Sequence, residues 1–480
     1  MRAVETRWVP AVAAVWWISA IALWQRTIWP ACIVAAVMIA ALVLLRSYGQ
    51  AVLTAGAALA AAAAAAYRLA RVPATVAGPV TAEVISVRAL DVHTAARTPH
   101  QQRPQPLLAS VHLPDNPATY PLFFPEPPGG VRPGDWISAV VSSTPAARPS
   151  LAGLSLNAHG VTVTGSRWSL VNYAVDRLTA ATAGFSPGVR GLLGGMIVGD
   201  QHLQEADDRA AFLAAGLSHL SAVSGSNVAI VLGAVVVCAE LAGLSPRCRV
   251  GLSAVALLGF VAMVGPDPSV LRAGTMGALS VAAMAGYRRM DTFHGLCLAT
   301  LVLLLVDPDL SVSFGFALSV SATAGIVLLV PVLTHALALG PLGRLPAAVL
   351  KAVALAMAAE IATAPLIALM TGHITAYSVV ANVAVALAVP PVTILGVVAV
   401  CAAMIFPSPA VAHWILLPAA ACCRWILFIA HFSAHAPHAL LTPPGGTRGP
   451  AVVLLAVAWL VYAAVALVAR RRGARPPPGP

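Results

Sequence analysis

The apolar positions of this chain form long uninterrupted runs instead of alternating with polar ones. No charged side chain lies between Arg7 and Arg26, between Arg26 and Arg46, or between Arg46 and Arg68. Each run approaches the roughly 20 residues that a helix needs to cross a bilayer core. The pattern predicts a block of three membrane-spanning helices at residues 8–25, 28–45 and 49–67, within residues 1–67.

A second helical region is predicted over residues 169–470. It opens with an amphipathic stretch at residues 170–179. Nine apolar runs follow, at residues 220–242, 249–265, 270–286, 292–306, 313–333, 349–370, 376–405, 411–430 and 450–469. A basic, proline-rich tail occupies residues 471–480, and arginine clusters stay on the cytoplasmic side of a membrane. If the N-terminus is also inside, the three helices before the intervening segment and the nine apolar runs after it place that segment outside.

That intervening segment, residues 68–168, has the pattern of a β-domain. Short alternating runs at residues 80–87, 107–113, 136–141 and 154–163 are separated by turn sequences such as Arg132-Pro133-Gly134-Asp135. We interpret it as a small extracytoplasmic β-barrel of the oligonucleotide-binding (OB) type. Its basic and aromatic side chains are candidates for DNA contacts, through phosphate and base stacking respectively: Arg97, Arg103, Arg132, Tyr120 and Trp136.

Composition supports the membrane interpretation. Hydrophobic residues make up 59% of the 480 residues and charged residues only 9%, against roughly 25% charged residues in soluble domains. The net charge of +11 suits anionic lipid or nucleic acid, and also the arginines that orient membrane proteins. The fold class is therefore an all-α polytopic protein of the inner (plasma) membrane with an inserted β-barrel. No cofactor is predicted, and most of the seven cysteines lie in apolar runs as small hydrophobic residues.

A set of polar and glycine residues occurs in order through the second helical region. A glycine-rich stretch, Gly191 to Asp200, precedes Gly216-Leu-Ser-His-Leu-Ser-Ala-Val-Ser-Gly225. Pro268-Ser-Val-Leu-Arg-Ala-Gly-Thr-Met276 and Phe314-Gly-Phe-Ala-Leu-Ser319 follow, then Thr363-Ala-Pro365, Tyr377 and Asn382. This set resembles the motifs of the ComEC family of competence proteins. The chain departs from many members at Ser226-Asn227, where they have Leu-His.

The resemblance implies passage of single-stranded DNA across the cytoplasmic membrane during natural transformation. It also implies an extracytoplasmic DNA-receptor protein, a separate nuclease and a cytoplasmic motor, and oligomerisation stays open. The sequence contains no His-x-His-x-Asp-His run, so the metallo-β-lactamase-like nuclease of many members is expected to be absent. The lone Lys351 follows no glycine-rich loop, so we expect no ATPase. We therefore predict a channel and not an enzyme.

Polar groups inside a bilayer are costly and face a cavity or one another. Hydroxyls and amides beside glycine suit either a polar conducting path or close helix packing with hydroxyls bonded to the backbone. The residues predicted to line the path or to form the family motifs are Asp200, His219, Ser221, Ser224, Gly225, Asn227, Arg272, Ser319 and Asn382. Arg272 is predicted either to attract phosphate or to pair with Glu360 and join two helices.

Other interpretations stay open. The spacing of His431 and His435 places both on one helix face, where they suit a metal ion or, without an acidic partner in sequence, a membrane interface. Ala222-Val-Ser-Gly225 is near the Gly-x-Ser-Gly motif of intramembrane serine proteases, although the leading glycine is missing. A transporter of a small molecule or lipid is a further alternative.

Overall fold

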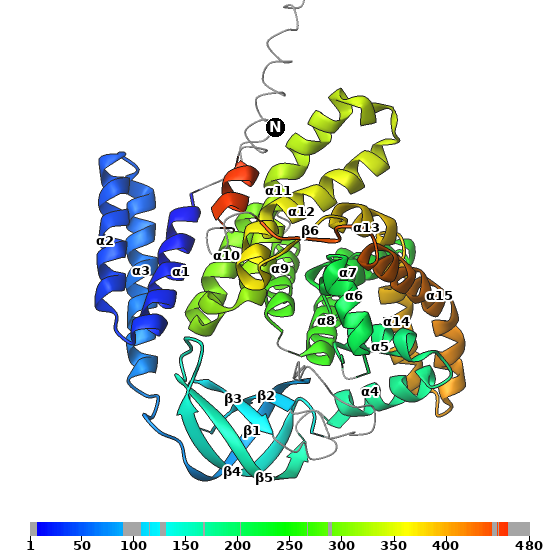
Figure 1. The fold of residues 1–480 in the computed structure, drawn as a ribbon, viewed down its shortest axis with the longest axis horizontal. Helices are drawn as coiled ribbons and strands as arrows, with labels where there is room; N and C mark the ends of the chain where they lie inside the picture. Colours follow the sequence, from blue (N-terminus) through cyan, green and yellow to red (C-terminus); the bar gives the residue numbers. More distant parts are fainter. Residues whose placement is uncertain are drawn as a thin grey trace, which may run out of the picture.

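The computed structural model describes residues 7–89, 107–114, 116–124, 131–166, 169–201, 203–265, 267–286, 290–443, 449 and 451–458. Its first element is a block of three helices, α1 (Val9–Gln25), α2 (Trp29–Leu44) and α3 (Tyr48–Leu69). The helices stand side by side at one edge of the molecule (Figure 1). Proline at the start of α1 and α2 lacks an N–H that the first turn leaves unbonded anyway. The three predicted apolar runs are thus confirmed as helices.

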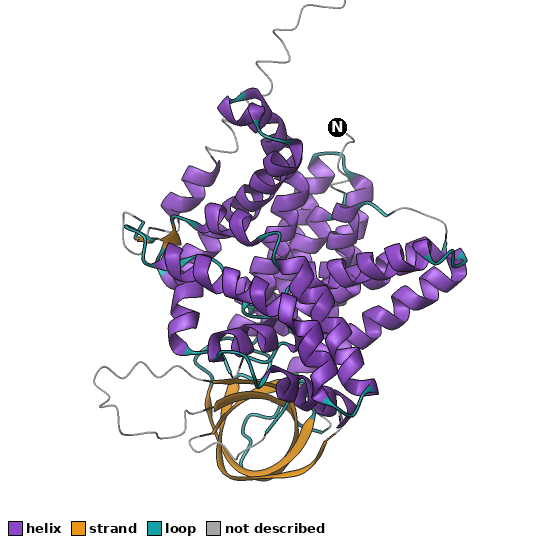
Figure 2. Ribbon diagram, turned by 90° about the vertical axis from the view of Figure 1, so that its right-hand side faces the viewer, coloured by secondary structure: helices purple, strands orange, loops and turns teal. Residues whose placement is uncertain are grey.

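A closed five-stranded barrel follows, formed by β1 (Gly78–Ala89), β2 (Leu107–His112), β3 (Thr119–Phe124), β4 (Asp135–Pro145) and β5 (Leu154–Ser166). The strand order around the barrel is β1-β2-β3-β5-β4, and β3 pairs with β5 in parallel. Figure 2 shows the barrel at one end of the helices. The predicted small barrel is confirmed, while the strand around Pro121 was missed because proline is unusual within a sheet.

The structure contradicts one predicted DNA contact of the barrel, Tyr120, while that of Arg132 stays a prediction. Tyr120 is 0% exposed, and its hydroxyl accepts a hydrogen bond from Asn116, so its ring cannot stack on a base. Arg132 is paired with Asp176 at 2.7 Å, an ion pair between the barrel and the following helix. Trp136 is half-buried, whereas Arg97 and Arg103 lie outside the described residues.

The second helical region begins with three short helices, α4 (Ser169–Thr182), α5 (Pro187–Val198) and α6 (Ala206–Ala214), and a 3-10 turn, η1 (Ser218–Leu220). The sequence predicted α4, and its glycine-rich stretch before Asp200 corresponds to α5, whereas α6 was missed. Both α5 and α6 are shorter than a span. Because α6 carries Asp207 and Asp208 in its first turn, it gives no apolar run.

The following helices occupy the predicted places. They are α7 (Gly225–Leu241), α8 (Pro246–Val264), α9 (Pro268–Ala285), α10 (Thr292–Val306), α11 (Phe314–Leu339), α12 (Ala347–Thr371), α13 (Ser378–Val385), α14 (Val389–Ile405) and α15 (Pro409–Ala434). A 3-10 turn, η2 (Pro308–Val312), joins α10 to α11, and another, η3 (Pro341–Arg344), joins α11 to α12. Two short strands, β6 (Ile374–Thr375) and β7 (Leu440–Leu441), pair antiparallel.

Among the described helices, α3, α8, α11, α12 and α15 are long and apolar enough to cross a membrane. The α13–α14 pair, bent by 50°, makes a sixth if it is one span. The predicted run at residues 376–405 is this broken pair. Of the predicted last span, residues 451–458 are helical and the remainder lies outside the described residues.

Candidate functional site

Three of the sequence motifs meet at the side chain of Arg272. This residue lies in the first turns of α9 and is only 6% exposed. Its Nε donates to the hydroxyl of Ser319 on α11 at 2.7 Å, and its Nη1 lies 3.2 Å from the sulfur of Met276. A Cβ on Gly225 would lie 2.6 Å from Nη2 of Arg272, so the glycine leaves room for the guanidinium at the start of α7. The predicted residues Gly225, Arg272 and Ser319 therefore form one site.

The start of α7 adds hydroxyl groups to this site. Ser224 is the N-cap of α7 with an extended backbone, and its hydroxyl lies 2.6 Å from that of Ser226. It also donates to the side-chain oxygen of Asn227 at 3.3 Å. Asn227 is buried and donates to the carbonyl of Met196 at 3.2 Å, which ties α7 to α5. The hydroxyls of Ser224 and Ser226 consequently lie at the N-terminal end of a helix beside a cation.

The electrostatics of the site favour an anion. The described contacts of Arg272 are to a hydroxyl and a thioether, and none is to a carboxylate. Glu360 accepts hydrogen bonds from Ser378 at 2.5 Å and Thr375 at 3.4 Å instead, so the predicted pairing of Arg272 with Glu360 is wrong. Burying a cation without a counter-charge costs several kcal/mol. The partial positive charge at the α7 N-terminus adds to that of the guanidinium, and an anion would offset both.

Asp200 lies at the end of the glycine-rich helix α5. Gly195 of α5 packs directly against the carbonyl of Ser221, a contact that leaves no room for a side chain. The backbone N–H of Asp200 donates to the carbonyl of Gly194 at 3.2 Å. The ion pair with Asp176 chiefly raises the pKa of Arg132 in the barrel, and the charge of Asp200 contributes. Asp200 therefore sits where α5, the motif segment and the barrel approach one another.

The segment between Gly216 and Ser224 is a turn and not a continuous helix. His219 lies in η1 and is exposed, whereas Ser221 is half-buried and donates to the carbonyl of Ser218 at 2.8 Å. The hydroxyl of Ser224 bonds with Ser226 and Asn227 rather than with an imidazole. A serine protease needs a base within hydrogen-bond reach of its nucleophile, and the described geometry gives Ser224 none.

Asn382 belongs to a second polar cluster on α12 and α13. Its amide donates to the carbonyl and hydroxyl of Ser378 at 3.0 and 3.3 Å, and Ser378 in turn donates to Glu360. Gly216 has φ of +70°, and a Cβ there would lie 2.7 Å from the side chain of Ser378. The predicted Asn382 therefore does not reach Arg272, but its cluster contacts the start of the motif segment.

Sequence reasoning missed a pair that joins α6 to α15. Nε2 of His431 lies 2.8 Å from Oδ1 of Asp208, a carboxylate that is 6% exposed. The second oxygen of Asp208 is buried without a hydrogen-bond partner in the described structure, as are both polar atoms of Gln204. The two paired residues are 223 positions apart in the sequence, which is why His431 was predicted to have no acidic neighbour.

Within the described residues, no group of three or more His, Cys, Asp or Glu side chains is arranged to hold a metal ion. His431 and His435 have ring centroids 6.3 Å apart. The pair of His431 with Asp208 instead gives this part of α15 a structural contact to α6.

Comparison with known proteins gives two matches. The family model described as "Competence protein" matches residues 196–471. "ComE operon protein 3" of Bacillus subtilis (strain 168) is 29% identical over 142 residues, which cover 30% of this chain and 18% of that protein. The chain therefore matches well under two thirds of that relative's length. No solved structure matches.

Proposed function

This chain belongs to the competence protein family, and from that membership we propose that it passes single-stranded DNA across the cytoplasmic membrane. The family supports a role in DNA uptake, and the apolar helices indicate a membrane protein. The matched region, residues 196–471, contains the whole site around Arg272. Transport of a single DNA strand is a more specific proposal than a role in DNA uptake, and it rests on the chemistry of that site.

The observation that carries the proposal is the convergence of three motif segments on a buried cation. A DNA strand presents one phosphate charge per nucleotide, and arginine binds phosphate oxygens through its planar N–H groups. Nη2 of Arg272 faces the start of α7, where the hydroxyls of Ser224 and Ser226 are also available. A phosphate at this position would neutralise the guanidinium and the helix end together.

The same arrangement suits passage better than tight binding. Conduction requires a site that attracts the ion yet releases it. One guanidinium already bonded to Ser319, with neutral hydroxyls around it, holds a phosphate less strongly than a cluster of cations would. Successive phosphates of one strand would then replace each other at Arg272.

We assign residues 1–67 to a transmembrane block, residues 68–168 to an extracytoplasmic barrel and residues 169–470 to the channel. In this proposal the barrel lies on the outer side, where a DNA-receptor protein and a separate nuclease deliver the strand. A cytoplasmic motor draws it inward at the other side. The ion pair of Arg132 with Asp176 and the proximity of Asp200 connect the barrel to the channel entrance.

The test is uptake of labelled duplex DNA by cells whose own copy of the gene is replaced by a variant. Arg272→Gln keeps hydrogen-bonding groups but removes the charge, and we expect at least a tenfold loss of uptake at normal protein abundance. The control is Arg344→Gln, at an exposed arginine in the α11–α12 connection. Normal uptake by Arg272→Gln would contradict the proposal. If that variant is not retained, Ser319→Ala, which frees Nε but keeps the charge, should still alter uptake.

A further inference from the structure

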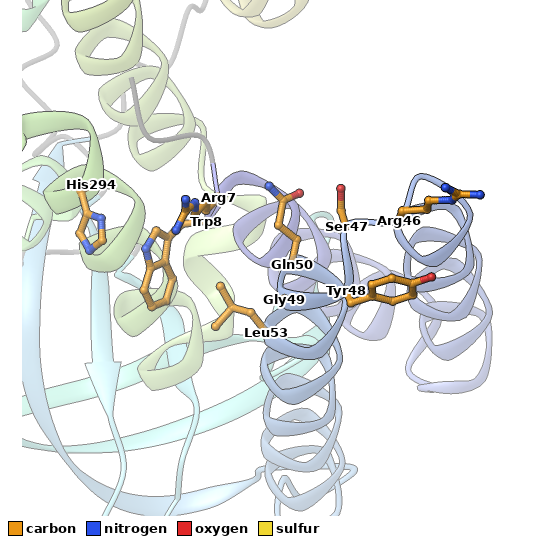
Figure 3. A pocket seen from close by; sticks show the side chains of 9 residues that line it. All are labelled: Arg7, Trp8, Arg46, Ser47, Tyr48, Gly49, Gln50, Leu53 and His294. Atoms are coloured by element: carbon orange, nitrogen blue, oxygen red, sulfur yellow. The ribbon is translucent and has the colours of Figure 1, made fainter. Parts of the chain in front are cut away.

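A pocket opens where the ends of four helices meet, away from the site around Arg272. Its volume is about 700 Å³. Arg7 and Trp8 line it at the start of α1, Arg46 and Tyr48 at the α2–α3 turn, and His294 at the start of α10 (Figure 3). The ring of Trp8 packs edge-on against His294, 5.3 Å between centroids. This contact fixes the wall between the N-terminal block and the channel region.

The pocket has a positive electrostatic character. Arg7 and Arg46 are both exposed, and the guanidinium of neither makes a hydrogen bond or ion pair with the part of the chain that the structure describes. The N-termini of α1 and α3 begin at this place, and their partial positive charges add to those of the arginines, whereas the carboxylate of Asp291 caps the N-terminus of α10. None of the described lining residues is acidic. An anionic group is therefore the ligand that this pocket favours.

The backbone of Arg46 points to a role for its side chain. It adopts φ of +56°, a left-handed conformation that glycine tolerates and that costs other residues about 1 kcal/mol or more. Arg26 has the same φ, and its guanidinium donates to the carbonyl of Leu151 at 2.7 Å. At Arg26 the left-handed backbone therefore accompanies a specific side-chain hydrogen bond. Arg46 has the same φ and lines the pocket at its outer end (Figure 3).

The lower wall of the pocket and its surroundings are apolar. Leu53 lines it on α3, one turn below the polar mouth. Beyond it, exposed apolar side chains follow the outer faces of α2 and α3, including Leu45 at 74% and Val52 at 74% exposed. Trp8 and Tyr48 stand at the boundary, where amphipathic aromatic rings concentrate at a membrane interface. A ligand with an anionic head and apolar chains matches a basic pocket that is continuous with the apolar faces of α2 and α3.

We infer that the pocket formed by Arg7, Trp8, Arg46, Tyr48, Leu53 and His294 binds the headgroup of an anionic phospholipid. The two arginines flank the anionic headgroup from opposite sides of the pocket (Figure 3), and the acyl chains extend along α2 and α3. The bound lipid bridges the N-terminal block and α10. This inference rests on the chain being a membrane protein and does not depend on DNA passage.

The test uses the full-length protein in detergent micelles, titrated with phosphatidylglycerol and followed by native mass spectrometry. Each basic residue near a membrane contributes about 1 kcal/mol to anionic lipid binding. We therefore expect the double variant Arg7→Gln/Arg46→Gln to bind phosphatidylglycerol at least tenfold more weakly. Arg247→Gln/Arg344→Gln removes the same charge from exposed positions outside the pocket and should change the affinity less than twofold.

Three outcomes would overturn the inference: equal weakening in both double variants, equal binding of phosphatidylcholine, or displacement of the lipid by glycerol 3-phosphate alone. The last would indicate a soluble phosphate ligand instead. The single variant Arg46→Gly guards against misfolding, because glycine suits the left-handed backbone and should not destabilise the chain. It should nevertheless lose affinity for the lipid, and a normal affinity in this variant would also reject the assignment.

Discussion

The carboxylate of Asp309 accepts a hydrogen bond of 2.5 Å from the backbone N–H of Leu151, a residue 158 positions earlier in the chain. Asp309 lies in η2 between α10 and α11, whereas Leu151 belongs to the β4–β5 connection of the barrel. Arg26, at the end of α1, donates to the carbonyls of Ser150 and Leu151. The barrel is thus attached to both helical regions through one loop.

This attachment has a pH dependence. Burial, reinforced by the neighbouring Asp307, raises the pKa of Asp309 from its ordinary 3.8 to about 7, although the Leu151 N–H, Arg26 and Arg68 act in the opposite direction. The attached state therefore holds a proton that the free carboxyl would lose near pH 4. The stability that protonated Asp309 contributes to the folded protein is complete below about pH 4 and is lost as the pH rises through about 7.

Asp309→Asn should remove this pH dependence. The amide oxygen still accepts from Leu151 and carries no charge at any pH. The melting temperature of the wild-type protein in detergent should fall between pH 5 and pH 8, whereas that of the variant stays nearly level. At pH 8 the variant should be the more stable, by up to about 4 kcal/mol. Asp207→Asn, at an exposed position on α6, serves as the control, and identical pH profiles for Asp309→Asn and wild type would refute the expectation.

Two glycines of α7 provide a matched pair for the site. A Cβ at Gly225 would lie 2.6 Å from the Arg272 guanidinium, while a Cβ at Gly233 would meet nothing within 4 Å. We expect Gly225→Ala to displace Arg272 and lower DNA uptake at least tenfold. Gly233→Ala should leave uptake unchanged and raise helix stability slightly. The measurement is uptake normalised to protein abundance, and equal uptake by both variants would show that the position of Arg272 is unimportant.

We expect substitutions of Asp208 and His431 to be strongly coupled in their effect on the stability of the protein. His431→Ala leaves a buried carboxylate without its partner and should destabilise the protein by about 3 kcal/mol. Asp208→Asn combined with His431→Ala should restore part of this loss, because the buried charge is then gone. Melting temperatures of the single and double variants give the coupling. His435→Ala, one turn along α15 and exposed, should have little effect. Additive losses would indicate that the two side chains act independently.

The barrel is expected on the outer side of the membrane, and a cysteine on β5 can test this. Val163 is exposed, and none of the native cysteines lies within residues 68–168. Val163→Cys should react with a membrane-impermeant maleimide in intact cells, above the background of the unmodified chain. Reaction only after the cells are permeabilised would place the barrel in the cytoplasm and reverse the proposed topology.

The sequence by itself determined the elements that depend on local pattern. Long apolar runs specified α1, α2, α3 and the helices from α7 to α15 nearly at their observed positions, because a span of apolar residues has few alternatives to a helix in a membrane. Alternation and turns likewise specified four of the five barrel strands. The ordered polar motifs indicated the family and identified Arg272, Ser319 and Gly225 as residues of interest.

Only the tertiary structure decided which of these residues meet. It placed Arg272 beside Ser319 and the start of α7 instead of beside Glu360, and it buried Tyr120 inside the barrel. The pairs Asp208–His431 and Leu151–Asp309 join residues 223 and 158 positions apart. Local pattern carries no information about such contacts, because they depend on how whole helices and the barrel pack together. The chain's periodicity thus determines its elements, and packing determines its sites.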